Sequence, residues 1–135
     1  MVELGQVYVD ASVIVGLTLA QAGALYGVKW ASATSSELIA ADVLRTLDRL
    51  RLTAGTPERG LAGLREIAER SLAGLSLVPI DKVVLRRAGG PFPTPIETLD
   101  AIHLATALLW ADYAGDIVFL THDRQLGIAV YPNPL

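Results

Sequence analysis

The sequence contains no cysteine, and this absence narrows the chemistry that the protein can perform. Without thiols the chain forms no disulfide, holds no zinc–thiolate site and carries out no thiol catalysis. Any metal that it binds must therefore have oxygen or histidine ligands. A chain free of cysteine also suits a reducing compartment.

Long apolar runs are missing too, although 52% of the residues are hydrophobic and the mean hydropathy is +0.44. Polar residues interrupt the chain often, and an apolar run such as residues 107–111 is far shorter than the ~18 residues of a transmembrane helix. The opening residues 1–5 lack the basic region and cleavage site of a secretory signal. We therefore expect a soluble cytoplasmic protein without a membrane partner.

Positive charge is scarce, because the formal net charge is -3. A protein that binds nucleic acid through electrostatics alone carries the opposite sign, since lysine and arginine neutralise phosphates. The charge thus argues against a plain DNA- or RNA-binding module. Without the four aspartates discussed below, the remainder of the chain is slightly positive, so a metal-filled acidic site stays compatible with a polyanionic substrate.

No repeat, low-complexity tract or long linker divides the 135 residues, so we expect one domain over residues 1–135. Short apolar segments alternate with segments of helical periodicity, which is typical of an α/β fold. The predicted strands are residues 6–9, 30–33, 75–80, 117–120 and 128–131. The predicted helices are residues 10–26, 36–52, 56–72, 81–89 and 98–113.

Four aspartates stand where an α/β fold can direct carboxylates into one cleft. Asp10 follows the first predicted strand, and Asp123 follows the strand at residues 117–120. Asp42 and Asp100 lie on predicted helices. Because clustered carboxylates repel one another, their convergence predicts a site for a hard divalent metal such as Mg²⁺ or Mn²⁺. Cleavage of a phosphate ester is a common reaction at such a site.

Each of these carboxylates also has a simpler structural explanation. Asp10 could cap the helix that follows it, and Asp42 could form a surface ion pair with Arg45, worth about 0.2–0.5 kcal/mol. Asp100 could interact with the N-terminal amides of its own helix or with His103, one turn further along. The fourth aspartate could form an Asx turn. These explanations do not account for the presence of all four acids in one chain.

Four blocks of sequence occur in a specific order. They are YVDAS at residues 8–12, SELIAADVLR at 36–45, TLDAIHLATA at 98–107 and LTHDRQL at 120–126. Together they resemble PIN-domain ribonucleases and, more narrowly, the VapC toxins of toxin-antitoxin pairs. The resemblance covers about residues 7–131, and it implies a PIN-like three-layer α/β/α fold with a central, mainly parallel sheet.

The resemblance places Asp10, Asp100 and Asp123 at the first, third and fourth acidic positions of the family. At the second position the family usually has a glutamate three residues before an arginine, and this register falls on Asp42. Glu37 has the expected residue type in a different register, so it remains the alternative. If both lay on one helix, about 140° would separate them, and only one would face the cleft.

The same resemblance implies the chemistry and the partners. Water activated by Mg²⁺ or Mn²⁺ would hydrolyse an RNA phosphodiester and leave a 5′-phosphate and a 3′-hydroxyl. The four aspartates would bind the metal, while Ser12 and Thr121 would orient them through hydrogen bonds. A VapB-like antitoxin would neutralise the enzyme, and the apolar composition favours a contact with that antitoxin or a homodimer.

Two other functions stay open. A metal-free ribonuclease could use His103 and His122 as acid and base, although the apolar helix around His103 suits a residue of the core. A PIN-fold protein without turnover could instead act by binding protein or RNA. Aspartate in place of glutamate at position 42 makes this second alternative concrete.

Overall fold

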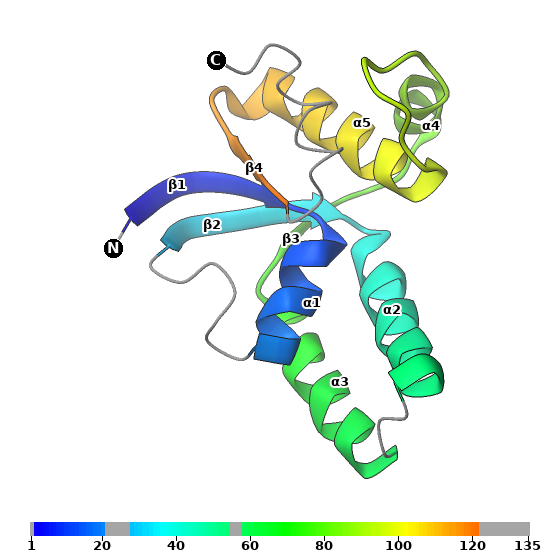
Figure 1. Cartoon of the computed structure of the whole chain (residues 1–135). Helices are drawn as coiled ribbons and strands as arrows, with labels where there is room; N and C mark the ends of the chain where they lie inside the picture. Colours follow the sequence, from blue (N-terminus) through cyan, green and yellow to red (C-terminus); the bar gives the residue numbers. More distant parts are fainter. Residues whose placement is uncertain (1, 21–27, 55–57, 122–135) are drawn as a thin grey trace.

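The computed structural model of the chain describes residues 2–20, 28–54 and 58–121. Its described part is built on a four-stranded sheet in which all neighbouring strands run parallel, in the order β3-β2-β1-β4 (Figure 1). The strands are β1 Val2–Val9, β2 Val28–Ser36, β3 Ser76–Val78 and β4 Val118–Leu120. The predicted α/β class with a mainly parallel sheet is confirmed.

Helices cover both faces of this sheet and complete a three-layer α/β/α arrangement (Figure 1). The helices are α1 Ala11–Ala20, α2 Ile39–Ala54, α3 Glu58–Ala73, α4 Lys82–Ala88 and α5 Thr98–Ala114. On one face α1, α2 and α3 pack against one another, and on the other face α4 packs against α5. None of the described helices is both long and apolar enough to cross a bilayer.

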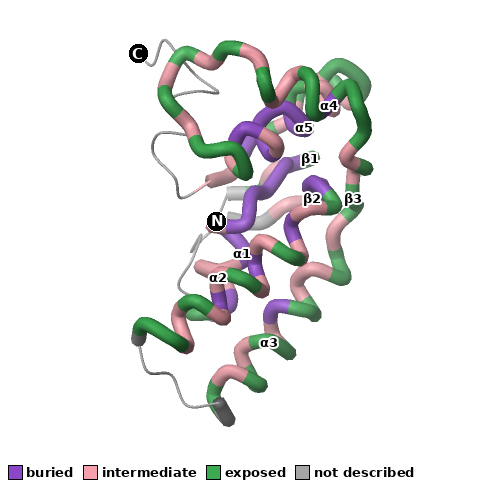
Figure 2. Tube along the Cα trace, turned by 90° about the vertical axis from the view of Figure 1, so that its right-hand side faces the viewer, coloured by how far each residue is buried: buried purple, intermediate pink, exposed green. Residues whose placement is uncertain are grey.

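Strand β1 supplies side chains to both layers of the core, because successive side chains of a strand point to opposite faces. Val7 and Val9 pack in a cluster with the apolar side chains of α1 and α2. Tyr8 points the other way and packs with Leu104 of α5 and Phe119 of β4. Buried positions accordingly gather along β1 and in α5 (Figure 2).

The junction between β2 and α2 differs from the prediction. The sequence indicated a helix from residue 36, whereas β2 continues to Ser36 and α2 begins at Ile39. The Ser36 hydroxyl accepts a hydrogen bond from the Leu38 N–H at 3.1 Å, and the Glu37 N–H donates to the Val78 carbonyl at 3.0 Å. These two bonds hold the junction as a turn beside β3 instead of a first helical turn.

Several local signals were interpreted correctly. The carboxylate of Asp81 accepts a hydrogen bond from the Val84 N–H at 2.9 Å and caps α4, which ends before Gly89. Helix α5 begins at Thr98, as predicted. The strand predicted at residues 128–131 lies outside the described residues.

The strand order creates a crevice beside β1. The chain passes outward from β1 to β2 and β3, and then returns to form β4 on the other side of β1. In open α/β sheets a ligand site forms at such a reversal, beyond the carboxyl ends of the strands. Asp10 follows β1 and Thr121 follows β4, so both residues lie at this reversal.

Two leucines of α2 provide a matched test of the core. Leu47 is 1% exposed, whereas Leu52 is 66% exposed. Leu47→Ala should lower the free energy of unfolding by about 2–5 kcal/mol, because it removes buried methyl groups and leaves a cavity. Leu52→Ala should change it by less than about 0.5 kcal/mol. Urea denaturation followed by circular dichroism measures both values, and equal losses would contradict the placement of Leu47 in the core.

Candidate active site

A cavity of about 410 Å³ opens beyond the carboxyl end of β1. Its walls come from α1, α2 and the first turn of α5, and they consist of Asp10, Ala11, Ser12, Val15, Gly16, Asp42, Thr46 and Asp100. Three predicted acids therefore share one cavity. Among the described residues that line it there is no lysine or arginine, so the cavity is negatively charged. Asp123 lies outside the described residues.

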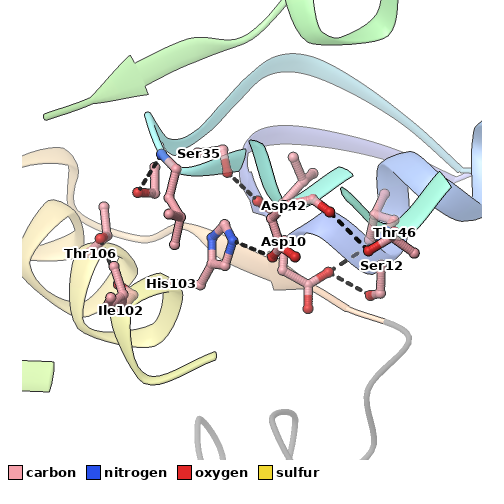
Figure 3. Close-up of polar contacts among 12 residues, drawn as sticks. Asp10, Ser12, Ser35, Asp42, Thr46, Ile102, His103 and Thr106 are labelled. Atoms are coloured by element: carbon pink, nitrogen blue, oxygen red, sulfur yellow. Dashed lines mark hydrogen bonds and ion pairs between the residues drawn. The ribbon is translucent and has the colours of Figure 1, made fainter. Parts of the chain in front are cut away.

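Asp10 is the most enclosed of the three acids, with 3% of its surface exposed, and it lies beside Ser12 (Figure 3). Three donors hold its carboxylate. Oδ1 accepts hydrogen bonds from the Ser12 hydroxyl at 2.6 Å and from the Val13 N–H at 3.3 Å. Oδ2 accepts one from the Thr121 hydroxyl at 2.5 Å. The bond from Val13 caps α1, so the capping role suggested for Asp10 is confirmed. Donors on both oxygens fix the side chain and leave about one of its four lone-pair sites, on Oδ2, for a further ligand.

Ser12 and Thr121 meet at this carboxylate from distant parts of the chain. Their hydroxyl oxygens lie 3.4 Å apart, and the Asp10 N–H donates to the Leu120 carbonyl at 3.4 Å. The start of α1 and the end of β4 are thereby joined around Asp10. The orienting role of Ser12 and Thr121 stays a prediction, and these contacts support it.

Asp42 reaches the cavity from the first turn of α2, with 15% of its side chain exposed. Its Oδ2 lies 3.3 Å from Nε2 of His103 on α5 (Figure 3). The structure gives Arg45 a different partner from the one that its spacing suggested, because the guanidinium binds Asp48 at 3.2 Å. The interaction of Asp42 is therefore with α5 and the cavity.

Glu37 lies elsewhere, in the turn before α2, so helical spacing does not relate it to Asp42. Its Oε1 accepts a hydrogen bond from the Ile80 N–H at 2.9 Å. This bond joins the end of β2 to the segment that follows β3. Glu37 is exposed and is not among the residues that line the cavity, so the geometry favours Asp42 as the second acid.

His103 has partners that the sequence did not reveal. We considered it as a neighbour of Asp100, but the ring contacts Asp42 through Nε2 and the Tyr8 hydroxyl through Nδ1, which is 3.2 Å away. Tyr8 is buried and stacks on Phe119 with 5.4 Å between the ring centroids. Burial raises the pKa of the Tyr8 phenol, so the hydroxyl keeps its proton.

The burial of His103 argues against the metal-free ribonuclease. The residue is 0% exposed, and both ring nitrogens lie within hydrogen-bond distance of protein groups. A catalytic acid or base must reach the proton that it transfers. The second histidine of that mechanism, His122, lies outside the described residues.

The residue types that line the cavity suit a hard divalent metal. Asp100 stands in the first turn of α5, where the helix N-terminus favours a negative charge, and it shares the cavity with Asp10 and Asp42. Within residues 2–20, 28–54 and 58–121, no three side chains of His, Cys, Asp or Glu are grouped closely enough to hold a metal ion. Carboxylate oxygens around a cavity without basic side chains are nevertheless the ligands that Mg²⁺ and Mn²⁺ prefer.

Comparison with known proteins shows the family of the chain. The family model of the PIN domain matches residues 7–129. Ribonuclease VapC46 of Mycobacterium tuberculosis (strain ATCC 25618 / H37Rv) is 39% identical over 108 residues, which are 77% of this chain and 75% of the relative. Ribonuclease VapC47 of Mycobacterium tuberculosis (strain CDC 1551 / Oshkosh) is 30% identical over 121 residues, which are 89% of this chain and 86% of the relative.

Proposed function

Because this chain belongs to the PIN domain family and is a VapC-like member of it, we propose that it is a metal-dependent endoribonuclease. It would act as a toxin that a VapB-like antitoxin neutralises, with its whole site in one PIN-like domain over residues 1–135. The observation that carries the proposal is the cavity shared by Asp10, Asp42 and Asp100. Three carboxylates around a cavity that has no lysine or arginine among its described lining can bind a cation, and a bound cation can in turn bind and polarise a phosphodiester.

We assign the binding of Mg²⁺ or Mn²⁺ to Asp10, Asp42, Asp100 and Asp123. The bound ion would supply an activated water and would polarise a phosphate oxygen. Without a cation the carboxylates would repel the phosphodiester, so substrate binding would depend on metal loading.

The other residues of the site would prepare these ligands. The hydroxyls of Ser12 and Thr121 hold both oxygens of Asp10, so its carboxylate keeps one orientation before the metal arrives. The N-terminus of α5 supports the charge of Asp100. Preorganised ligands lose less conformational freedom on binding, which strengthens the site.

The size of the cavity supports an unpaired RNA substrate. About 410 Å³ is within the usual range of small-ligand sites, roughly 300–1,000 Å³, and is large enough for one nucleotide. A double helix is too wide to enter such a space. Unpaired loops also let a base leave the stack, so the loop of a structured RNA such as tRNA is the substrate class that we propose.

The proposal includes two protein partners, a VapB-like antitoxin and a second copy of the chain. The acidic cavity would attract a basic segment of a VapB-like antitoxin, which would block access to RNA. On the opposite side of the sheet, a groove of about 380 Å³ between α4 and α5 is lined by apolar side chains that include Val83 and Trp110. Tyr113 at this groove is 88% exposed, which supports a contact with a second copy of the chain.

Chelation tests the metal requirement. The purified protein should cleave an unpaired, end-labelled RNA in Mn²⁺ and should lose this activity in EDTA, because the bound ion supplies the activated water in the proposed mechanism. Excess Mn²⁺ or Mg²⁺ should restore cleavage, which is measured on a denaturing gel. Cleavage that survives EDTA would contradict the proposed mechanism. Binding of RNA without cleavage in Mn²⁺ would instead support the PIN-fold protein without turnover.

A further inference from the structure

His103 is a buried polar residue that the proposed mechanism does not use. Its ring is fully enclosed, yet its two nitrogens face polar partners from two other elements, Asp42 of α2 and Tyr8 of β1. Burying a polar ring is unfavourable unless hydrogen bonds compensate for the lost contact with water. An apolar side chain of similar size would fill the same space without needing hydrogen bonds. The polar contacts of His103 therefore indicate a role beyond packing.

The contact with Asp42 has a defined direction. A carboxylate only accepts hydrogen bonds, so Nε2 of His103 carries the proton and donates it to Oδ2 of Asp42 at 3.3 Å. This bond occupies one oxygen of Asp42, which also lines the acidic cavity. The bond therefore ties the second acid to α5, the helix that carries Asp100.

The other ring nitrogen of His103, Nδ1, also has a polar partner. Nδ1 of His103 lies 3.2 Å from the hydroxyl of Tyr8, and the two rings meet edge to face with centroids 6.3 Å apart. The Tyr8 ring in turn stacks on Phe119. Because Tyr8 and Phe119 belong to adjacent strands, the sheet itself fixes the plane of the His103 ring.

We propose that His103 is a positioning residue that holds the Asp42 carboxylate toward the cavity, with Tyr8 fixing the ring, and thereby raises the metal affinity of the site. The inference rests on the proposed function, because it takes Asp42 as a metal ligand. A carboxylate that is already oriented loses less rotamer freedom when the metal binds. Loss of a partner that orients a ligand typically weakens metal binding about 10- to 100-fold.

Replacing His103 by glutamine or by asparagine tests its contact with Asp42 apart from its contact with Tyr8. The amide nitrogen of glutamine reaches about as far as Nε2 of histidine, and that of asparagine about as far as Nδ1. His103→Gln should therefore keep a donor beside Asp42, whereas His103→Asn should keep a polar group beside Tyr8 and lose the bond to Asp42. Both variants remove the ring, so both should lower the thermal unfolding midpoint.

The readout is the affinity of the folded chain for Mn²⁺ alone, measured by the electron paramagnetic resonance signal of free Mn²⁺. His103→Asn should weaken binding about 10- to 100-fold, whereas His103→Gln should stay close to wild type. Leu47→Ala, which destabilises the core without touching the cavity, should bind Mn²⁺ like wild type. This control separates positioning from a general loss of stability.

Equal affinity of wild type, His103→Asn and His103→Gln would overturn the inference, and so would equal weakening of both variants. If neither variant folds, Tyr8→Phe tests the inference instead. This substitution keeps the stacking on Phe119 and removes only the hydroxyl that contacts His103. Its Mn²⁺ affinity should fall several-fold, and an unchanged affinity would overturn the inference. Wild-type protein that binds no Mn²⁺, or binds it no better than Asp42→Asn, would overturn the proposed function instead.

Discussion

Asp10→Asn should abolish RNA cleavage, lowering kcat/KM by at least about 100-fold, while the chain stays folded. Residues that only support a metal ligand cost about 10- to 100-fold when they are replaced, so a proposed ligand should cost more. Asp10 is also the carboxylate on which Ser12, Val13 and Thr121 converge, so its replacement removes an acid that the fold holds in one orientation. Initial rates on a labelled RNA in Mn²⁺ measure the loss.

Folding should survive this substitution for a structural reason. The amide oxygen of the new side chain would still accept from Ser12 and Val13, and its NH₂ group would face the Thr121 hydroxyl, which can accept a hydrogen bond. Asp10→Leu would remove the acceptor of all three hydrogen bonds, and a buried polar group that loses its partner costs about 1–3 kcal/mol. Thermal unfolding should therefore separate the two variants. Equal cleavage by wild type and a folded Asp10→Asn would contradict the carboxylate mechanism.

Asp42→Asn should lower cleavage by about 10- to 100-fold or more, whereas Glu37→Gln should leave cleavage nearly unchanged. Both substitutions remove one negative charge and keep the length of the side chain. Only Asp42 lines the cavity and contacts His103, while Glu37 binds the backbone of Ile80. The rates of both variants, measured side by side in Mn²⁺, identify the second acid.

A further variant shows what Glu37 does instead. Glu37→Gln keeps an oxygen for the Ile80 N–H, but Glu37→Ala removes it. Glu37→Ala should lower the free energy of unfolding by about 1 kcal/mol without changing the rate of cleavage by the folded enzyme. A loss of cleavage in Glu37→Gln together with an active Asp42→Asn would reverse the assignment.

The parts of the fold that could be predicted were those with signals close together in the sequence. The cap of α4 at Asp81 and the start of α5 at Thr98 depend on neighbouring residues, and both agree with the structure. The full length of β2 could not be predicted, because its second half contains small and polar residues with weak preference for a strand. Pairing with β1 and β3 makes it a strand, and that pairing is long-range.

The candidate site could likewise be predicted only in part from the sequence. Strand ends and family register led to Asp10, Asp42 and Asp100, and the structure brings these three to one cavity. The contacts of His103 join positions that are 61 and 95 residues apart, so no local pattern reveals them. One signal was available, since Tyr8 lies only two positions before Asp10 at the end of β1, and a polar group so near the first acid is a candidate neighbour of the site.

The ion pair of Arg45 with Asp42, which spacing offered as an alternative, is not the one in the structure. Three residues separate Arg45 from both Asp42 and Asp48, and the structure pairs it with Asp48. Arg51 binds the same carboxylate at 3.1 Å, so Asp48 forms ion pairs with two arginines. Asp42 is turned toward α5 instead, and helical spacing does not distinguish these two directions.

The hydrogen bond from Thr121 to Asp10 joins positions that are 111 residues apart. This separation determines when the site can form during synthesis on the ribosome. A ribosome makes β1 first, but the strand that completes the setting of Asp10 is β4, near the other end of the described chain. Asp100 is also translated late. A nascent chain that ends before α5 therefore carries Asp10 without Asp100 and Thr121, so the proposed site forms only late in synthesis.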